Sequence, residues 1–169
     1  MTALLVAVAF LSAGAQAGKL TLSGSISGTG VLPTSLLVMP VDGQGTDSIV
    51  VRRNKVEGAV GDSLRGLSRL VGVAGHRQVI LPVWLDGKTR LRLSLGADGC
   101  LTNKSDADNR ALSAFNEDVY RRSRALWEQG RQISPEREKA MAGGYLTVAD
   151  SLVTALKPNG DVSAYLRAW

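Results

Sequence analysis

The only thiol and the only imidazole in the chain, Cys100 and His76, are the first candidates for chemistry. Thiol–disulfide exchange of the thioredoxin kind needs two cysteines two residues apart, so that one attacks and the other resolves the mixed disulfide. A single cysteine does not meet that requirement. As a lone nucleophile, Cys100 would need His76 as its base, and the two are far apart in the sequence. The alternative is an incidental, partly buried thiol.

Carboxylates offer few candidates for metal binding. The segment Asp106-Ala107-Asp108-Asn109 resembles the start of a calcium loop, but the glycine at the sixth position and the later glutamate are missing. Helix capping is therefore the alternative role for this segment. Zinc would need three or four ligands, and one Cys plus one His leaves only carboxylates for the rest. Asp42 and Asp47 flank a Gly-rich turn, and loop stabilisation explains them better than a ligand pair.

The remaining catalytic motifs are incomplete. Gly24 to Gly30 lacks the Gly-Lys-Ser/Thr ending of a phosphate loop and the dinucleotide-binding spacing. A Ser-His-Asp triad would have to use His76, and no serine stands in a nucleophile-elbow pattern. The sequence therefore predicts that this chain is not an enzyme and holds no cofactor, with no catalytic, cofactor-binding or metal-binding residues.

Basic residues exceed acidic ones and give a formal net charge of +5. The arginines lie in different predicted elements: Arg52 and Arg53, Arg90 and Arg92, and Arg121, Arg122 and Arg124. They have no interleaved aromatic residues on which bases could stack. Solvated faces are the simpler interpretation, and nucleic acid is not expected as a partner.

The first residues indicate export. An apolar run from Met1 to Ser12 is too short to span a bilayer comfortably, and it leads into Ala15-Gln16-Ala17, a small-residue pattern typical of signal-peptidase sites. Residues 1–17 are therefore predicted to be a signal peptide. A buried first strand is the alternative, because no Lys or Arg precedes the apolar run. We expect a soluble periplasmic or envelope protein with no internal disulfide and no membrane span in the mature chain.

Residues 18–100 carry strand signals. Lys19 to Ile26 alternates apolar with polar residues at period two, which is typical of a strand with one face on a core. The segment 64–73 is ambiguous, with a short helical turn and then a strand from Arg69 as the preferred interpretation. Asp86-Gly87-Lys88 predicts a hairpin between strands 78–85 and 89–95. In the second of these strands one set of side chains should face a core (Leu91, Leu93 and Leu95) and the other should face out (Arg90, Arg92 and Ser94). Further strands are predicted at 35–41, 48–53 and 56–60.

Residues 101–169 change to helical spacing. Leu112, Phe115, Val119 and Leu126 predict an amphipathic helix over about 108–129. A second helix should begin at Ser134-Pro135 and end at Pro158-Asn159-Gly160, and a short third element should follow from Val162 to Trp169. The apolar face of the second helix would consist of Met141, Tyr145, Val148, Leu152 and Leu156.

The predicted fold class is mainly β with an α tail. Short connections favour an antiparallel sheet or sandwich, followed by two to three amphipathic helices. The predicted domains are an antiparallel β domain over 18–100 and a helical extension over 101–169, which would lead toward a further C-terminal domain.

The order of these segments resembles the N-terminal domain of unknown function that precedes the thioredoxin fold in exported TlpA-like thiol-disulfide oxidoreductases. The residues that carry the likeness are Leu20 to Gly28, a strand ending in a glycine pattern; Asp47 to Val51 and Asn54 to Gly58, two strands about a turn; an apolar hairpin from Leu81 to Leu95; and the helix start Asn109-Arg110-Ala111-Leu112-Ser113-Ala114-Phe115, which reads N-x-x-L-x-x-F. The chain departs from the family at Asn54-Lys55, where an Asn-Gly turn is usual, and at Val56, where an aromatic residue is usual.

The resemblance implies an envelope protein beside a redox domain, with a thioredoxin-like domain or client proteins as partners. It carries no functional residue over to this chain, since its motifs are not catalytic and the chain has no Cys-x-x-Cys. The expected function is a non-catalytic accessory module that acts through protein contacts. The alternative is a stand-alone envelope binding module that offers a sheet edge or an apolar groove to a peptide, glycan or lipid.

Overall fold

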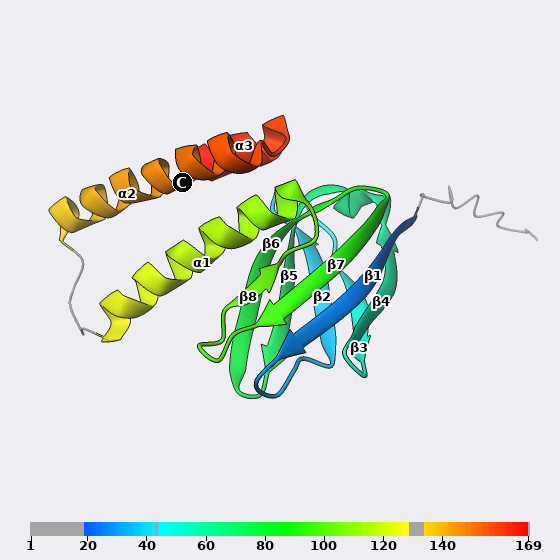
Figure 1. Ribbon diagram of the computed structural model, residues 1–169. Helices are drawn as coiled ribbons and strands as arrows, with labels where there is room; N and C mark the ends of the chain where they lie inside the picture. The colour runs from blue at the N-terminus through cyan, green and yellow to red at the C-terminus, as the bar shows by residue number, and fades with distance from the viewer. Residues whose placement is uncertain (1–18, 43, 129–133, 169) are drawn as a thin grey trace, which may run out of the picture.

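The computed structural model describes residues 19–42, 44–128 and 134–168, so the predicted signal peptide and Trp169 lie outside the described residues. Eight strands come first along the chain and three α-helices follow (Figure 1). The elements are β1 (Lys19–Gly28), β2 (Ser35–Pro40), β3 (Asp47–Arg52), β4 (Lys55–Gly61), a 3-10 helix η1 (Asp62–Leu64), β5 (Gly66–Ala74), β6 (Arg77–Leu85), β7 (Lys88–Leu95), β8 (Leu101–Asn103), α1 (Ala107–Glu128), α2 (Pro135–Leu156) and α3 (Gly160–Arg167).

All eight strands belong to one sheet, in the order β6-β5-β2-β3-β4-β1-β7-β8. Six neighbouring pairs are antiparallel, whereas β1 and β7 are parallel, from Thr21 opposite Lys88 to Gly28 opposite Leu95. The sheet curls so strongly that its two edge strands, β6 and β8, come into contact, and the result is nearly a barrel (Figure 1). The predicted class, a β sheet followed by amphipathic helices, is confirmed. The parallel pair, which makes the sheet mixed, was not predicted.

The predicted hairpin between strands 78–85 and 89–95 is wrong. β6 pairs with β5 along its whole length, and β7 pairs with β1 and β8 instead of β6. At Asp86-Gly87 the chain passes from β6, at one edge of the sheet, to β7, next to the other edge. The Gly87 carbonyl accepts from Thr21 N on β1 at 3.1 Å. The predicted turn does form, but β7 pairs with β1 in a long parallel ladder, and parallel pairing between strands distant in the sequence has no local signal. β6 instead forms a hairpin with β5, about a turn in which Gly75 has a φ of 62°.

Alternate side chains of the strands fill the interior of the barrel. Leu91, Leu93 and Leu95 are buried, and Arg90 and Arg92 are exposed, as the alternation predicts. The ambiguous segment begins as the 3-10 helix η1 and becomes β5 at Gly66, three residues earlier than predicted. Gly66 has a φ of 94°, and this left-handed conformation allows the strand to start directly after the turn.

Helix α1 lies along the seam where β6 and β8 meet, and its side chains bind the backbone of both edge strands. Asn109 accepts from Trp84 N at 3.0 Å and donates to Trp84 O at 3.1 Å, on β6. Ser113 Oγ accepts from Asn103 N and donates to Asn103 O, on β8. Asn116 Nδ2 donates to the Ile80 carbonyl at 3.4 Å. A stripe of polar residues on one helix face therefore satisfies edge groups that would otherwise invite another strand.

The three helices share a second apolar core outside the barrel. Ala111, Leu112 and Phe115 of α1 are buried against α2 and α3, and the Phe115 and Tyr145 rings meet edge to face with centroids 6.2 Å apart. The predicted face of α2 packs into this core, and its predicted start is confirmed, because Ser134 Oγ accepts from Arg137 N. Asp108 on α1 accepts two hydrogen bonds from Asn159, which fixes the connection between α2 and α3.

Candidate functional site

Cys100 lies in the seam, where it is 5% exposed beside α1. Burial, with the negative charges of Asp98 and Glu117, raises the pKa of the Cys100 thiol to about 11. Its Sγ donates to the Leu101 carbonyl at 3.9 Å, whereas His76 is exposed in the β5–β6 turn. The thiol therefore stays protonated near neutral pH and lacks the thiolate character that a nucleophilic cysteine needs.

The calcium candidate at 106–109 acts as a helix start. Asp106 Oδ1 accepts from Asn109 N at 2.8 Å, and Oδ2 accepts from Asn109 Nδ2 and Ser105 Oγ. The Asp108 carboxylate accepts hydrogen bonds from Asn159, so it is directed away from a shared ion site with Asp106. Asp47, the other carboxylate of interest, accepts from Gly61 N at 2.6 Å and so joins the start of β3 to the end of β4. Within residues 19–42, 44–128 and 134–168, no three His, Cys, Asp or Glu side chains are grouped as a metal site would require.

The glycine-rich segment 24–30 is the end of β1 and the turn that follows it. At Gly24 a Cβ atom would stand 1.9 Å from the Leu91 carbonyl oxygen, which no packing can accommodate. The glycine therefore allows β1 and β7 to approach closely in their parallel ladder. Its role is structural, and it lies in the barrel wall.

The most unusual surface is the outward side of β2, β5 and β6. Cross-strand pairing places Leu37 opposite Val71, and Val71 opposite Ile80, in one row. Met39 and Val73 extend the row along β2 and β5. Leu37, Met39, Val73 and Ile80 are 43%, 38%, 63% and 47% exposed. We call Leu37, Met39, Val71, Val73 and Ile80 the apolar face.

A hollow of about 350 Å³ lies at the α3 end of the apolar face. Its lining consists mainly of apolar residues (Met39, Pro40, Val71, Ile80 and Pro82), together with Arg69 of β5, Asn116 of α1 and Tyr165 of α3. A second hollow of about 530 Å³ adjoins it, shares Pro40 and Tyr165, and runs beneath α3 past Trp84. The apolar face thus continues into a groove between the sheet and the last helix.

Sequence reasoning missed the apolar face, although a signal was present. The strand 35–40 reads Ser-Leu-Leu-Val-Met-Pro, and 70–73 reads Leu-Val-Gly-Val, so both strands are apolar on successive residues instead of alternating. Such continuous runs are typical of strands that are covered on both faces. In this chain the outward face of both strands is open to solvent.

The scattered arginines are also closer together than the sequence indicates. Arg52 and Lys55 pair across β3 and β4, and β1 separates Lys55 from Arg92 on β7. All three are exposed. The arginines of α1, by contrast, are bound to acids one turn away: Arg121 to Glu117, Arg122 to Asp118 and Arg124 to Glu128.

None of the described helices is both long enough and apolar enough to cross a membrane. Comparison of the chain with models of protein families, with curated proteins and with solved structures finds no match.

Proposed function

We propose that this chain is a non-catalytic accessory module of an exported thioredoxin-like thiol-disulfide oxidoreductase of the cell envelope, and that it acts through protein contacts. The observation that carries the proposal is the apolar face. Scattered exposed apolar side chains are normal, but a contiguous row that leads into a groove is typical of a surface that another protein covers. β2 and β5 each pair with strands on both sides, and side chains of α1 bind backbone groups of the edge strand β6, so a partner would bind the apolar face by side-chain packing.

The state of Cys100 supports a non-catalytic role. A pKa of about 11 leaves the thiol protonated at the pH of the envelope, and burial beside α1 restricts access to it. Disulfide exchange in which this chain takes part would therefore use the cysteines of its partner.

The resemblance gains a physical basis from the seam. Asn109 binds both backbone groups of Trp84, and Leu112 and Phe115 are buried beneath α2 and α3. Asn109 thus docks the first helix onto the sheet, and Leu112 and Phe115 pack it against the other two helices. A pattern with this role favours a shared fold, and the accessory function is the proposal that follows from it.

Isolation of the native protein from its own cells, followed by intact-mass measurement and peptide sequencing, tests the proposal. We expect a Cys-x-x-Cys thioredoxin fold in the same polypeptide or in a stable complex with it. Disulfide exchange by that preparation should fall when Leu37→Asn and Ile80→Asn are combined. The matched control is Leu146→Asn on α2, where the side chain is 44% exposed.

A stand-alone binding module for a peptide, glycan or lipid is the second candidate. The sheet edges do not favour it, because α1 side chains occupy backbone groups of β6 and β8. The groove of about 350 Å³ does favour it, since most of its lining is apolar and Arg69, Asn116 and Tyr165 can supply polar contacts. A native mass near that of this chain without residues 1–17, with no Cys-x-x-Cys protein bound, would support this candidate and contradict the first.

A further inference from the structure

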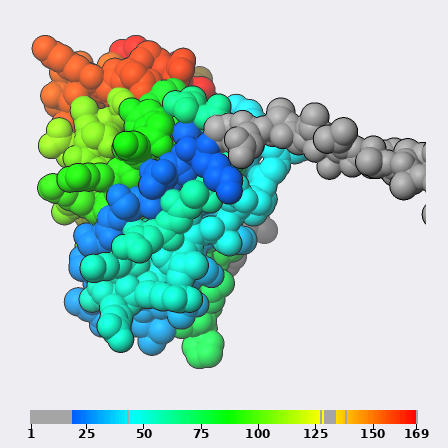
Figure 2. All heavy atoms as spheres, turned by 90° about the vertical axis from the view of Figure 1, so that its right-hand side faces the viewer, coloured from blue at the N-terminus to red at the C-terminus, as the bar shows by residue number. Residues whose placement is uncertain are grey.

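A second surface lies on the other side of the barrel, where β1 runs between β4 and β7. Figure 2 shows this side of the molecule, with β1 in blue beside β4 in teal. The outward residues of β1 are Thr21, Ser23 and Ser25, all exposed and all small. Most of the side chains on either side of them are longer. Pairing places Lys88, Arg90 and Arg92 of β7 opposite them on one side, and Ala59, Glu57 and Lys55 of β4 on the other.

Small residues between longer ones form a shallow trough along β1, with hydroxyls on its floor and mostly cations at its rim. We call it the β1 trough. Further positive charges lie next to the trough. Arg52 of β3 pairs with Lys55 of β4, and Lys104 lies beside Arg92, since its N–H donates to the Arg92 carbonyl at 3.0 Å. Glu57 is the one acid among these side chains.

The cations of the trough are unpaired. Among the described residues, every ion pair lies elsewhere, in η1 and the helices or between α2 and α3. Arg90 and Arg92 are exposed and have no carboxylate within ion-pair distance in that part of the chain. Their guanidinium groups are free to bind an anionic partner, and Arg pairs with carboxylates through two parallel hydrogen bonds.

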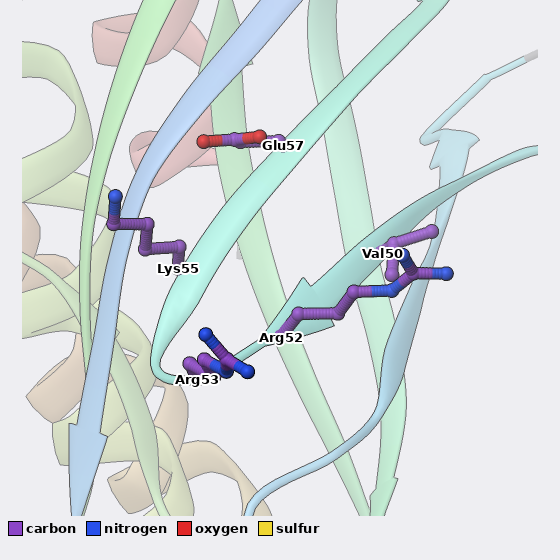
Figure 3. A pocket seen from close by; sticks show the side chains of 5 residues that line it. All are labelled: Val50, Arg52, Arg53, Lys55 and Glu57. Atoms are coloured by element: carbon purple, nitrogen blue, oxygen red, sulfur yellow. The ribbon is translucent and has the colours of Figure 1, made fainter.

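At one end of the trough the β3–β4 turn adds one further cation, Arg53. Arg53 and Asn54 take left-handed conformations, with φ of 49° and 64°, which turn the chain tightly between Arg52 and Lys55. A hollow of about 650 Å³ opens there, lined by Val50, Arg52, Arg53, Lys55 and Glu57. Figure 3 shows Arg53 and Lys55 at the turn end and Glu57 farther along β4.

The charge of these side chains, their spacing and the kinds of residue around them together indicate the partner. Alternate residues of a strand are about 6.7 Å apart, so Lys88, Arg90 and Arg92 form a row with that repeat. An extended peptide with acids at alternate positions has the same repeat of about 6.7 Å. An extended single-stranded nucleic acid can space its phosphates similarly, but the described residues of the trough include no aromatic ring on which its bases could stack. We propose that the β1 trough binds an extended acidic segment of a partner protein, with alternate carboxylates on Lys88, Arg90 and Arg92.

Fluorescence anisotropy with a labelled peptide of alternating Glu and Thr tests the proposal. A peptide of the same composition, with its glutamates in one block, serves as the comparison probe. We expect the alternating peptide to bind more tightly than the block peptide. Combining Arg90→Gln with Arg92→Gln should weaken its binding about tenfold, as two exposed ion pairs would. Glu57→Gln should strengthen binding about twofold, because it removes the one repulsive charge.

The matched control combines Arg121→Gln with Arg124→Gln, which removes the same net charge from α1, where both arginines already have partners. This control should bind the peptide as the unmodified chain does. Equal weakening by the two double variants would overturn the proposal, because it would show attraction to net charge alone. Equal affinity for the two peptides would overturn it too, as would tighter binding to a single-stranded oligonucleotide or to vesicles of anionic lipid.

Discussion

The two halves of the barrel wall are alike inside and different outside. The inward residues of β2, β5 and β6 and those of β4, β1 and β7 are equally apolar, and they form one core. Outward, the first half presents Leu37, Val71 and Ile80, whereas the second presents Ser23, Ser25 and Arg90. Folding requires only the inward pattern, since either outward composition is compatible with the same sheet. We propose that the difference reflects what each half binds, an apolar protein surface on one side and an acidic segment on the other.

The largest expected effect comes from the junction that holds the polar half together. Gly24→Ala places a methyl carbon only 1.9 Å from the Leu91 carbonyl oxygen, and this clash forces β1 away from β7. We expect the free energy of unfolding to fall by about 3 kcal/mol, as in severe overpacking. Urea denaturation measures this loss. The control is Gly30→Ala, which meets no atom within 4 Å, and equal stability of the two variants would refute the close approach of β1 and β7.

The next effect comes from the seam, where the apolar half meets α1. Asn109→Ala leaves the N–H and C=O groups of Trp84 without their partners, so we expect a loss of about 2 kcal/mol in the free energy of unfolding. Asn116→Ala removes a single, longer bond from an exposed position and should cost less than about 1 kcal/mol. Denaturation of both variants checks the order. A larger loss at Asn116 would contradict the account of the seam.

The thiol in the seam adds a dependence on pH. Because the pKa of Cys100 is about 11 in the folded chain and about 8.5 in an unfolded chain, the folded state holds its proton more tightly. Its contribution to stability is complete below about pH 8.5 and is lost as the pH rises toward 11. The difference in stability between the unmodified chain and Cys100→Ala should therefore shrink between these values. A constant difference across this range would contradict the raised pKa.

The smallest effect on stability is expected at the apolar face itself. Leu37→Asn and Ile80→Asn change exposed side chains, so each should alter the free energy of unfolding by less than about 0.5 kcal/mol. Thermal denaturation checks this. A large loss would mean that these residues serve the fold, and the contrast between the two halves would then lose its functional meaning.

Much of this fold could be predicted from the sequence, because period-two and helical spacing are local signals. The inward leucines of β7, the start of α2 at Ser134 and the stop at Pro158 all follow from neighbouring residues. Strand order could not be predicted. The Asp86-Gly87 turn has residues typical of a hairpin. β7 nevertheless pairs with β1, whose residues lie 67 positions earlier in the chain (Thr21 opposite Lys88), and this pairing is defined only in the folded sheet.

The two surfaces were hidden for the same reason. Arg52, Lys55 and Arg92 look scattered in the sequence because they lie on three strands that are adjacent only in the sheet. The apolar face likewise combines β2, β5 and β6. The prediction that this chain has no dithiol chemistry of its own depended less on topology. Thioredoxin-type exchange needs two cysteines, and the given sequence has one, wherever that cysteine lies in the fold.

Cross-linking inside the native cells tests the central claim most directly. A photoreactive amino acid at Ile80, on the apolar face, is activated in intact cells, and the adducts are sequenced by mass spectrometry, with the same substitution at Leu146 as the control. The account predicts that Ile80 cross-links to a polypeptide segment of a Cys-x-x-Cys protein and that Leu146 does not. Adducts of Ile80 with lipid, with glycan or with a second copy of this chain, or equal adducts at both positions, would contradict it.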